Sequence, residues 1–415
     1  MRYLSFLLTL LAASSLVNPR NGPLHFLLWA PKLLATALAP LLALASFLLT
    51  LLGWRRRDWV LTGGGAAGRA VALRHFLAIV APRRTLMSDA FGPDWEARLS
   101  PDIAARFSAR PWRPLVYGEP NGQVWRNVRY GYNTDADNPL YADLLSPPPN
   151  VPPSGLAIIF IHGGAWRFGR RNISKFPYFR QLAGQGHLVM DIDYTLSPQA
   201  SLPGMVMDVK RAIIWLKAHA AEYNLNPQRI VLVGQSAGGH LALLAAYTPN
   251  YAGLQPKDVA GDSSVRAVIS FYGPPDMIAL HHDLEARFGS VLTEDVMVRV
   301  NGLLTWAGED KVAHGVSGLI GGSLEEIPEM YRLISPSTYV DADCPPTLLL
   351  HGTHDVLVDH QAAERLHQAL KKAGVPVVYL PLPGCEHTFE SVLPRVSPAA
   401  QTAVYYMERF LALTV

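Results

Sequence analysis

The sequence predicts an α/β fold in which a mostly parallel sheet is covered by helices on both faces. Two observations predict it: short runs that are apolar throughout, as in strands buried on both faces, and helical stretches that alternate with these runs over residues 123–415. The predicted strands lie around 124–130 and at 140–145, 156–161, 187–192, 230–233, 265–271, 347–350 and 377–380. The predicted helices are 205–223, 236–247, 361–372 and 399–411.

Composition narrows the class of protein. The chain has 415 residues, enough for one large domain with appendages or for two domains. Its 49% apolar and 17% charged residues exclude a mainly disordered chain, and a net charge of only +3 gives no support for nucleic-acid binding. The two cysteines, Cys344 and Cys385, exclude a disulfide scaffold and the common zinc motifs, although one bridge between them remains an alternative to two free thiols.

Residues 1–54 are predicted to anchor the chain in a membrane. They hold only three charges, Arg2, Arg20 and Lys32, and no acidic residue. A first apolar run covers 3–17, and a second, 33–52, has no charge and is long enough to cross the hydrocarbon core. The turn-forming sequence NPRNGP joins the two runs, so we expect two transmembrane helices.

The orientation of this anchor follows from its charges. Trp54 and the basic residues Arg55–Arg57 end the second run, and the positive-inside rule places such a cluster in the cytoplasm. We therefore expect a two-pass protein in which everything after Trp54 is cytoplasmic. A second interpretation is that residues 1–17 are a cleaved signal peptide, which would leave one anchoring helix and the same orientation.

Residues 55–122 are interpreted as an interfacial and linker segment. Apolar residues at helical spacing within 58–80 are interrupted by Arg69, Arg74 and His75, which favours a helix at the membrane surface over a third span. The glycine-rich stretch 63–68 is interpreted as a flexible connector, because no βαβ unit surrounds it. Prolines punctuate the polar sequence that follows.

A nucleophile is predicted where the 230–233 strand ends. Residues 230–240 read IVLVGQSAGGH: a strand, the pattern Gly-x-Ser-x-Gly, and the start of a helix rich in Ala and Leu. A strand-to-helix turn this tight requires small residues beside the serine, and Gly234 and Gly238 provide them. Ser236 is therefore predicted to expose its hydroxyl at the apex of the turn. The pentapeptide alone is weak evidence; the strand and helix around it make the prediction specific.

A base and an acid for this serine are predicted at two later strand ends. Asp355 follows the 347–350 strand, and His387 follows the 377–380 strand. The chain order Ser236, Asp355, His387 is the order of the catalytic triad in proteins whose nucleophile lies on a strand-turn-helix. Rival acids are Asp359, which is expected to cap the next helix, and Asp343, which precedes its strand. The rival bases are His351 and His354, which are placed beside the acid rather than opposite the serine.

An oxyanion hole is predicted after the 156–161 strand, which runs directly into His162-Gly-Gly-Ala-Trp166. Residues without side chains let the amides of Gly163 and Gly164 point at a substrate oxygen, together with the amide of Ala237. Trp166 and Gln235, which belong to these two motifs, are expected to bind the substrate.

These motifs resemble those of the α/β-hydrolase superfamily. His162-Gly-Gly-Ala-Trp166, Gly234-Gln-Ser-Ala-Gly-Gly239 and the loop at 191–198 (DIDYTLSP) are similar to the feruloyl and acetyl esterase-like branch, to kynurenine formamidases and to prenylcysteine methylesterases. They depart from the His-Gly-Gly-Gly and Gly-Asp-Ser-Ala-Gly-Gly patterns of the related hormone-sensitive-lipase-like esterases. The resemblance implies an α/β-hydrolase domain over 123–415. It also implies catalysis through an acyl-enzyme on Ser236, without metal or cofactor.

The substrate is less well defined by the sequence. Residues 276–335 form an insertion whose apolar residues are typical of a helical cap over an acyl pocket. The cap and the membrane anchor together predict a small-molecule or lipid-like ester substrate; the oligomeric state is unknown. An amide or formamide hydrolase remains an alternative, as does a non-catalytic binding protein of the same fold.

Overall fold

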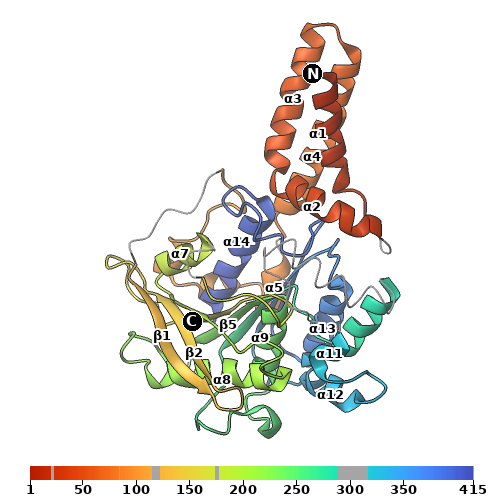
Figure 1. The fold of residues 1–415 in the computed structure, drawn as a ribbon. Coiled ribbons are helices and arrows are strands. Elements are labelled where there is room, and N and C mark those ends of the chain that lie inside the picture. The colour runs from red at the N-terminus through yellow and green to blue at the C-terminus, as the bar shows by residue number, and fades with distance from the viewer. Residues whose placement is uncertain (20–22, 84, 115–121, 173–176, 288–315, 415) are drawn as a thin grey trace.

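The computed structural model describes residues 1–19, 23–83, 85–114, 122–172, 177–287 and 316–414. A bundle of amino-terminal helices stands on one side of a body built around a single sheet (Figure 1). The sequence predicted all eight strands that the described residues contribute to the sheet. They are β1 (Val124–Asn133), β2 (Asn138–Leu145), β3 (Ala157–Ile161), β4 (Leu188–Ile192), β5 (Ile230–Gln235), β6 (Ala267–Phe271), β7 (Thr347–Gly352) and β8 (Val377–Leu382).

The sheet is mostly parallel, in the order β1-β2-β4-β3-β5-β6-β7-β8. Only the β1–β2 and β2–β4 pairs are antiparallel; every later pair is parallel. Strands β3 to β7 are buried along their whole length, which explains why their sequences are apolar without alternation. The carboxyl ends of the parallel strands therefore meet at one edge, where the predicted functional loops lie.

Helices cover both faces of the sheet. On one face lie α8 (Leu202–Ala218), α9 (Ala237–Tyr247) and α13 (His360–Lys372), whose apolar residues share a core with alternate residues of the strands. On the other face lie α7 (Pro177–Gly184) and α14 (Pro398–Leu413), in a second core with the remaining strand residues. The connecting elements are α5 (Thr85–Phe91), η1 (Trp95–Arg98), α6 (Pro101–Ala104), η2 (Ala252–Leu254) and η3 (Pro336–Tyr339).

The described parts of the 276–335 insertion include three helical segments: residues 277–287, α11 (Val316–Ile320) and α12 (Pro328–Leu333). Met277, Leu280 and Tyr331 are buried in the main core rather than on a free surface. Six of the apolar residues on which the cap prediction depends lie outside the described residues: Phe288, Val291, Leu292, Leu303, Leu304 and Trp306.

The amino-terminal bundle contains three helices side by side, α1 (Arg2–Ser14), α3 (Ala39–Arg55) and α4 (Trp59–Val80). A fourth helix, α2 (Pro23–Ala37), lies across the base of the bundle, next to the body (Figure 1). The sequence predicted one uninterrupted helix over 33–52, but the chain turns by 80° between α2 and α3. Pro40 explains the break, because it has no amide hydrogen for the carbonyl four residues earlier and its ring clashes with that carbonyl.

The glycine-rich stretch 63–68 lies inside α4, so the prediction of a flexible connector was wrong. These glycines let the helices pack closely. A Cβ atom on Gly65 would lie 2.7 Å from the amide nitrogen of Thr50 in α3, and one on Gly64 would lie 2.6 Å from the Ser5 hydroxyl in α1. The Thr9 hydroxyl of α1 also donates a hydrogen bond to the Gly64 carbonyl oxygen at 2.8 Å.

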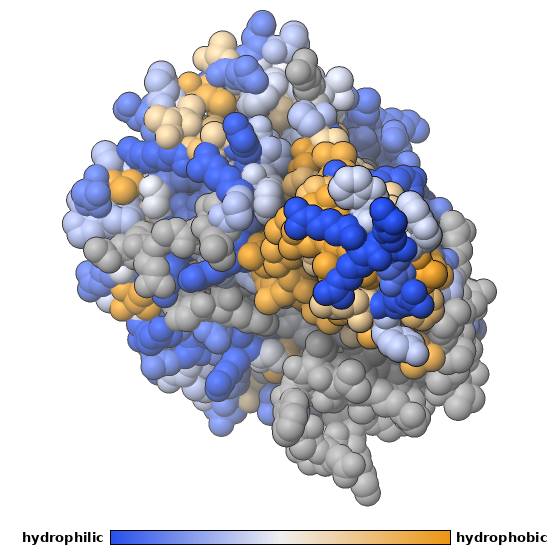
Figure 2. Space-filling view, turned by 90° about the horizontal axis from the view of Figure 1, so that it is seen from above, coloured by the Kyte–Doolittle hydropathy of each residue, from blue (hydrophilic) through white to orange (hydrophobic). Residues whose placement is uncertain are grey.

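The bundle carries its large apolar side chains on the outside. Most of the exposed large apolar residues that the structure describes lie in 1–80. Figure 2, which looks down on the bundle, shows this hydrophobic surface around a hydrophilic tip. Among the described residues no single helix qualifies by length and composition as a membrane span, but the bent pair Leu27–Ala37 and Ala39–Arg55 does so jointly.

The tip and the body lie at opposite ends of the bundle. Exposed Arg55–Arg57 form the turn between α3 and α4, and Asp58 there pairs with Arg2 at 2.8 Å. Because α4 then returns the chain to the body, the expectation of two passes followed by a body on the same side as Arg55–Arg57 does not fit this arrangement. The sequence favoured an interfacial helix for 58–80 because of its charges; in the structure, His75 is buried at the base.

Candidate active site

Ser236 stands at the apex of the turn between β5 and α9, as the sequence predicted. Its backbone has φ 53° and ψ −120°, an unfavourable conformation for a residue with a side chain. The neighbouring glycines make the turn sterically feasible, because a Cβ on Gly234 would lie 2.1 Å from the Gly238 carbonyl oxygen, and one on Gly238 2.1 Å from that of Ile161. The Ser236 amide donates to the Phe271 carbonyl oxygen at 2.9 Å, which fixes the turn to β6.

The loops after β7 and β8 bring Asp355 and His387 to this serine. His387 Nε2 lies 2.9 Å from Ser236 Oγ, and His387 Nδ1 lies 2.8 Å from Asp355 Oδ2. The side chains of Asp355 and His387 are almost completely buried, while Ser236 is partly exposed. A histidine that donates its Nδ1–H to the carboxylate leaves Nε2 free to accept the serine proton. The arrangement can therefore activate the hydroxyl as a nucleophile.

Asp355 is held as an ionised acceptor. Its Oδ1 accepts the amides of Leu357 and Val358 at 2.8 and 2.9 Å, and its Oδ2 also lies 3.1 Å from His351 Nε2. Burial alone would raise the pKa of Asp355, but the two histidines, His387 above all, hold it well below its usual range. The carboxylate therefore stays charged beside His387.

The rival residues have other partners. Asp359 caps α13 by accepting the Gln361 amide at 3.0 Å, and Asp343 lies in an exposed turn before β7. His351 contacts Asp355, as described above, and His354 lines a cavity at the base of the bundle. None of these four is the histidine at Ser236 or the carboxylate at His387.

Two of the predicted oxyanion donors, Gly163 and Ala237, lie beside Ser236. A Cβ on Gly163 would lie 3.2 Å from Ser236 Cβ, and Gly164 has φ 131°, which only glycine adopts without strain. Among the described residues, the Gly163 and Gly164 amides donate to no backbone carbonyl. Ala237 is the first residue of α9, and a helix amino terminus favours negative charge. His162 stacks on Tyr194 with ring centres 4.5 Å apart, so it braces the loop.

Trp166 and Gln235, predicted to bind substrate, are both buried and engaged elsewhere. The Trp166 indole donates to His240 Nδ1 at 3.2 Å. The Gln235 amide donates to Glu390 Oε1 at 2.6 Å and to the Tyr178 hydroxyl at 3.1 Å. These contacts argue against the predicted role, because both side chains are used to support the turn from behind. Adjacency in sequence to the motifs suggested contact with the substrate, but Gln235 is the last residue of β5 and its side chain contacts Tyr178 and Glu390, while Trp166, in the loop after β3, packs against His240 of α9.

Sequence reasoning missed the buried groups behind His387. The Tyr272 ring centre lies 4.3 Å from that of His387, and the Tyr272 hydroxyl donates to Glu390. Burial raises the pKa of Glu390, although the bond from Tyr272 opposes the rise. A second carboxylate, Glu386, directly precedes His387 and pairs with Lys32 of α2. The signal for Glu386 was its place next to His387; Lys32 stood out only as one of the three charges in residues 1–54.

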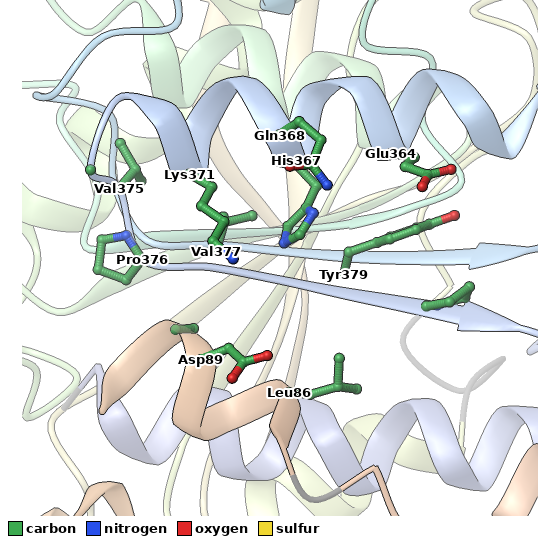
Figure 3. Close-up of a pocket in the computed structure, with 13 residues that line it drawn as sticks. Leu86, Asp89, Glu364, His367, Gln368, Lys371, Val375, Pro376, Val377 and Tyr379 are labelled. Carbon is green, nitrogen blue, oxygen red and sulfur yellow. The ribbon is translucent and has the colours of Figure 1, made fainter. Parts of the chain in front are cut away.

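One cavity adjoins these loops, and another lies away from them. One of about 300 Å³ lies between the base of the bundle and the loops that carry Asp355 and His387, and is lined by Ser15, His75, Thr353 and Pro383 among others. Another of about 470 Å³ runs along edge strand β8 between α5 and α13 (Figure 3). Neither of these cavities is lined by the side chain of Ser236, Asp355 or His387. The first adjoins the candidate site through Thr353 and His354 of the Asp355 loop and Pro383 and Gly384 of the His387 loop.

Comparisons with known proteins agree with this architecture. A family model described as BD-FAE matches residues 143–370, more than half of the chain. The probable carboxylic ester hydrolase LipM of Mycobacterium tuberculosis is 36% identical over 256 residues, covering 61% of this chain and 53% of LipM. Esterase LipQ of the same organism is 28% identical over 311 residues, covering 73% of this chain and 68% of LipQ. The chain thus matches only about half the length of LipM.

Among solved structures, the apo form of Thermogutta terrifontis esterase 2 has a TM-score of 0.51 at 24% identity. The match covers 70% of this chain and 93% of that one, and it shows the α/β-hydrolase fold. The chain therefore belongs to the BD-FAE family, within the esterase branch of the α/β-hydrolases.

Proposed function

We propose that this chain is a membrane-anchored carboxylesterase that hydrolyses lipophilic esters through an acyl-enzyme on Ser236. The observation that supports this most directly is the hydrogen-bonded series of Ser236, His387 and Asp355 at the carboxyl edge of the sheet. Oxygen, imidazole and carboxylate are each within 3 Å of the next, the arrangement that nucleophilic acyl transfer requires.

The reaction proceeds in two halves. His387 Nε2 takes the Ser236 proton as Oγ attacks the ester carbonyl, and the amides of Gly163, Gly164 and Ala237 stabilise the oxyanion. The protonated His387 then gives its proton to the departing alcohol, which leaves an acyl-serine. Water attacks this acyl group, His387 again carries the proton, and the free acid leaves. Asp355 stays ionised and stabilises the imidazolium in both halves.

The construction of the bundle supports a membrane anchor. Large apolar residues face outward, while glycines and hydroxyl side chains fill the contacts between α1, α3 and α4, which is how helices associate in lipid. At 1.5 Å per residue, α3 and α4 are about 25 and 33 Å long, close to the thickness of a hydrocarbon core. Arg69 within the apolar belt stacks over Phe47, 4.5 Å from the ring centre, which lessens the cost of its charge.

The orientation we propose differs from that expected from the sequence. The positive-inside rule places the Arg55–Arg57 tip in the cytoplasm. Because the tip and the body are at opposite ends of the bundle, the catalytic domain then lies on the other side of the membrane. The cavity at the base of the bundle, next to the Asp355 and His387 loops, lies where a substrate would leave the bilayer.

The substrate class is tested by hydrolysis of p-nitrophenyl esters with two to sixteen carbons, by the full chain in detergent micelles. We expect activity that increases with chain length, because the site adjoins an apolar anchor. A maximum at two to four carbons would contradict the lipophilic substrate and leave an esterase of water-soluble esters. Turnover of formanilides without turnover of any ester would contradict the esterase proposal itself and favour an amide or formamide hydrolase.

The orientation is tested with single cysteines and a membrane-impermeant maleimide in sealed vesicles of known sidedness. Native Cys344 and Cys385 are buried, so they give little background. We expect Arg56→Cys at the tip and Asn250→Cys on the exposed surface of the body to be labelled from opposite sides. Labelling of both cysteines from the same side would contradict the proposal that α1, α3 and α4 cross the membrane together.

A further inference from the structure

A fully buried ion pair joins the amino-terminal helices to the catalytic loops. Lys32 Nζ of α2 contacts Glu386 Oε1, and neither side chain has any exposed surface. The two residues come from opposite ends of the sequence, and Glu386 is the residue immediately before His387. A buried ion pair requires both of its charges, because removing either partner leaves an uncompensated charge in the interior, which strongly destabilises the fold.

Glu386 connects three parts of the structure through one carboxylate. Its Oε2 accepts the amide of Val356 at 3.0 Å, and Val356 directly follows Asp355. Its Oε1 is held by Lys32. The Glu386 carboxylate therefore connects the loop that carries Asp355 to the loop that carries His387, and Lys32 of α2 holds this carboxylate in place.

The electrostatics of Glu386 make this tie depend on Lys32. Burial raises the pKa of Glu386 to about 7, while Lys32 and the Val356 amide oppose the rise and Asp355 adds to it. Without Lys32, the charged carboxylate would lie unpaired in the interior beside a second one. It would then become protonated or move toward water, and either change alters its bond to the Val356 amide.

Two other helices of the bundle, α1 and α4, also lie against this loop. A Cβ on Gly384 would lie 2.9 Å from the His75 ring of α4 and 3.2 Å from the carbonyl oxygen of Ser15, at the end of α1. Residues 384–387 thus lie against α1, α2 and α4 together. The amino-terminal helices therefore pack directly against the loop that carries His387.

We propose that Lys32 is a positioning residue for catalysis, acting through Glu386 to hold His387 in register with Asp355 and Ser236. This inference rests on the proposed function, since it assigns Lys32 a role in that reaction. It also makes the anchor a structural component of the active site rather than a tether. Lys32 touches neither substrate nor reacting atoms; its effect is transmitted by the loop that begins at Glu386.

The test compares full-length variants in detergent, using a water-soluble p-nitrophenyl ester for kcat and KM. The rate of Ser236 labelling by a fluorophosphonate reports the activated serine independently of ester binding. Lys32→Met is expected to lower kcat and the labelling rate together by about 10- to 100-fold, because small misplacements of a catalytic group cost this much, with little change in KM. The double variant Lys32→Met with Glu386→Gln is expected to regain part of this loss, since it leaves no unpaired charge and Gln still accepts the Val356 amide.

A matched control is Lys210→Met, which removes another buried lysine, one that donates to the Thr248 carbonyl oxygen at the far end of α9. It is expected to lower the melting temperature without lowering kcat. Glu386→Asp provides a variant that keeps a carboxylate near Lys32 but is one methylene too short for the Val356 amide. Should Lys32→Met fail to fold, Glu386→Asp is still expected to show the loss of kcat and labelling rate.

Wild-type kcat and labelling rate in folded Lys32→Met, or in Glu386→Asp where only that variant folds, would overturn the proposal. A loss of kcat that matches the loss caused by Lys210→Met at equal melting temperature would overturn it as well. Failure of the proposed function looks different: the wild-type protein itself would neither hydrolyse esters nor react with the fluorophosphonate.

Discussion

Replacement of Ser236 by alanine is expected to reduce kcat for ester hydrolysis by about 10⁶-fold, to the background set by the remaining site. The Oγ atom lies 2.9 Å from His387 Nε2 and is the only atom that the arrangement supplies for a covalent intermediate in the proposed mechanism. The measurement is hydrolysis of the best p-nitrophenyl ester, together with fluorophosphonate labelling, which should disappear with Oγ.

Ser154→Ala is the matched control. Ser154 also makes hydrogen bonds, with its Oγ 2.7 Å from His187 Nδ1, but it precedes β3 and so lies at the amino edge of the parallel strands. We expect wild-type kcat and full labelling in this variant. Hydrolysis that survives in Ser236→Ala at more than about a thousandth of the wild-type rate would exceed what an oxyanion hole and binding alone provide, and would contradict the proposed nucleophile.

Much of the hydrolase body was predictable because local rules and fold agree there. A strand buried on both faces has to be apolar throughout, and a strand-turn-helix nucleophile needs glycine at Gly234 and Gly238, so both leave a direct trace in the sequence. The loops after β7 and β8 carry Asp355 and His387 to the same edge for a topological reason, and chain order was enough to select them from their rivals.

The contacts between distant segments were not predictable in this way. Nothing local to Lys32 says that α2 crosses the base of the bundle and meets Glu386, because a lone lysine beside an apolar run is equally typical of a membrane boundary. The glycine-rich stretch 63–68 is similar: because no βαβ unit surrounds it, it was interpreted as a connector, and glycine lowers helix propensity. Packing against Ser5 and Thr50 favours the helix instead.

Asp355→Asn is expected to lower kcat by about 10⁴-fold while the protein remains folded. An asparagine at this position can present its NH₂ group to His387 Nδ1, which favours the tautomer that carries its proton on Nε2 and therefore cannot accept the proton of Ser236. Because the folded pKa of Asp355 lies below its unfolded value, its charge stabilises the fold at neutral pH. That contribution is lost only as pH falls through the folded pKa.

Asp359→Asn separates this effect from a general loss of carboxylate near the site. Asp359 caps α13 through the Gln361 amide and pairs with Arg287 at 3.0 Å. Asparagine caps a helix as well as aspartate does, so the change should cost at most about 1 kcal/mol of stability through the lost ion pair, and leave kcat nearly unchanged. The two variants differ by four positions in one loop, and the structure assigns the carboxylate at His387 to Asp355 alone of the two. Equal losses of kcat in both variants would mean that the loop as a whole, rather than the contact of Asp355 with His387, supports the reaction.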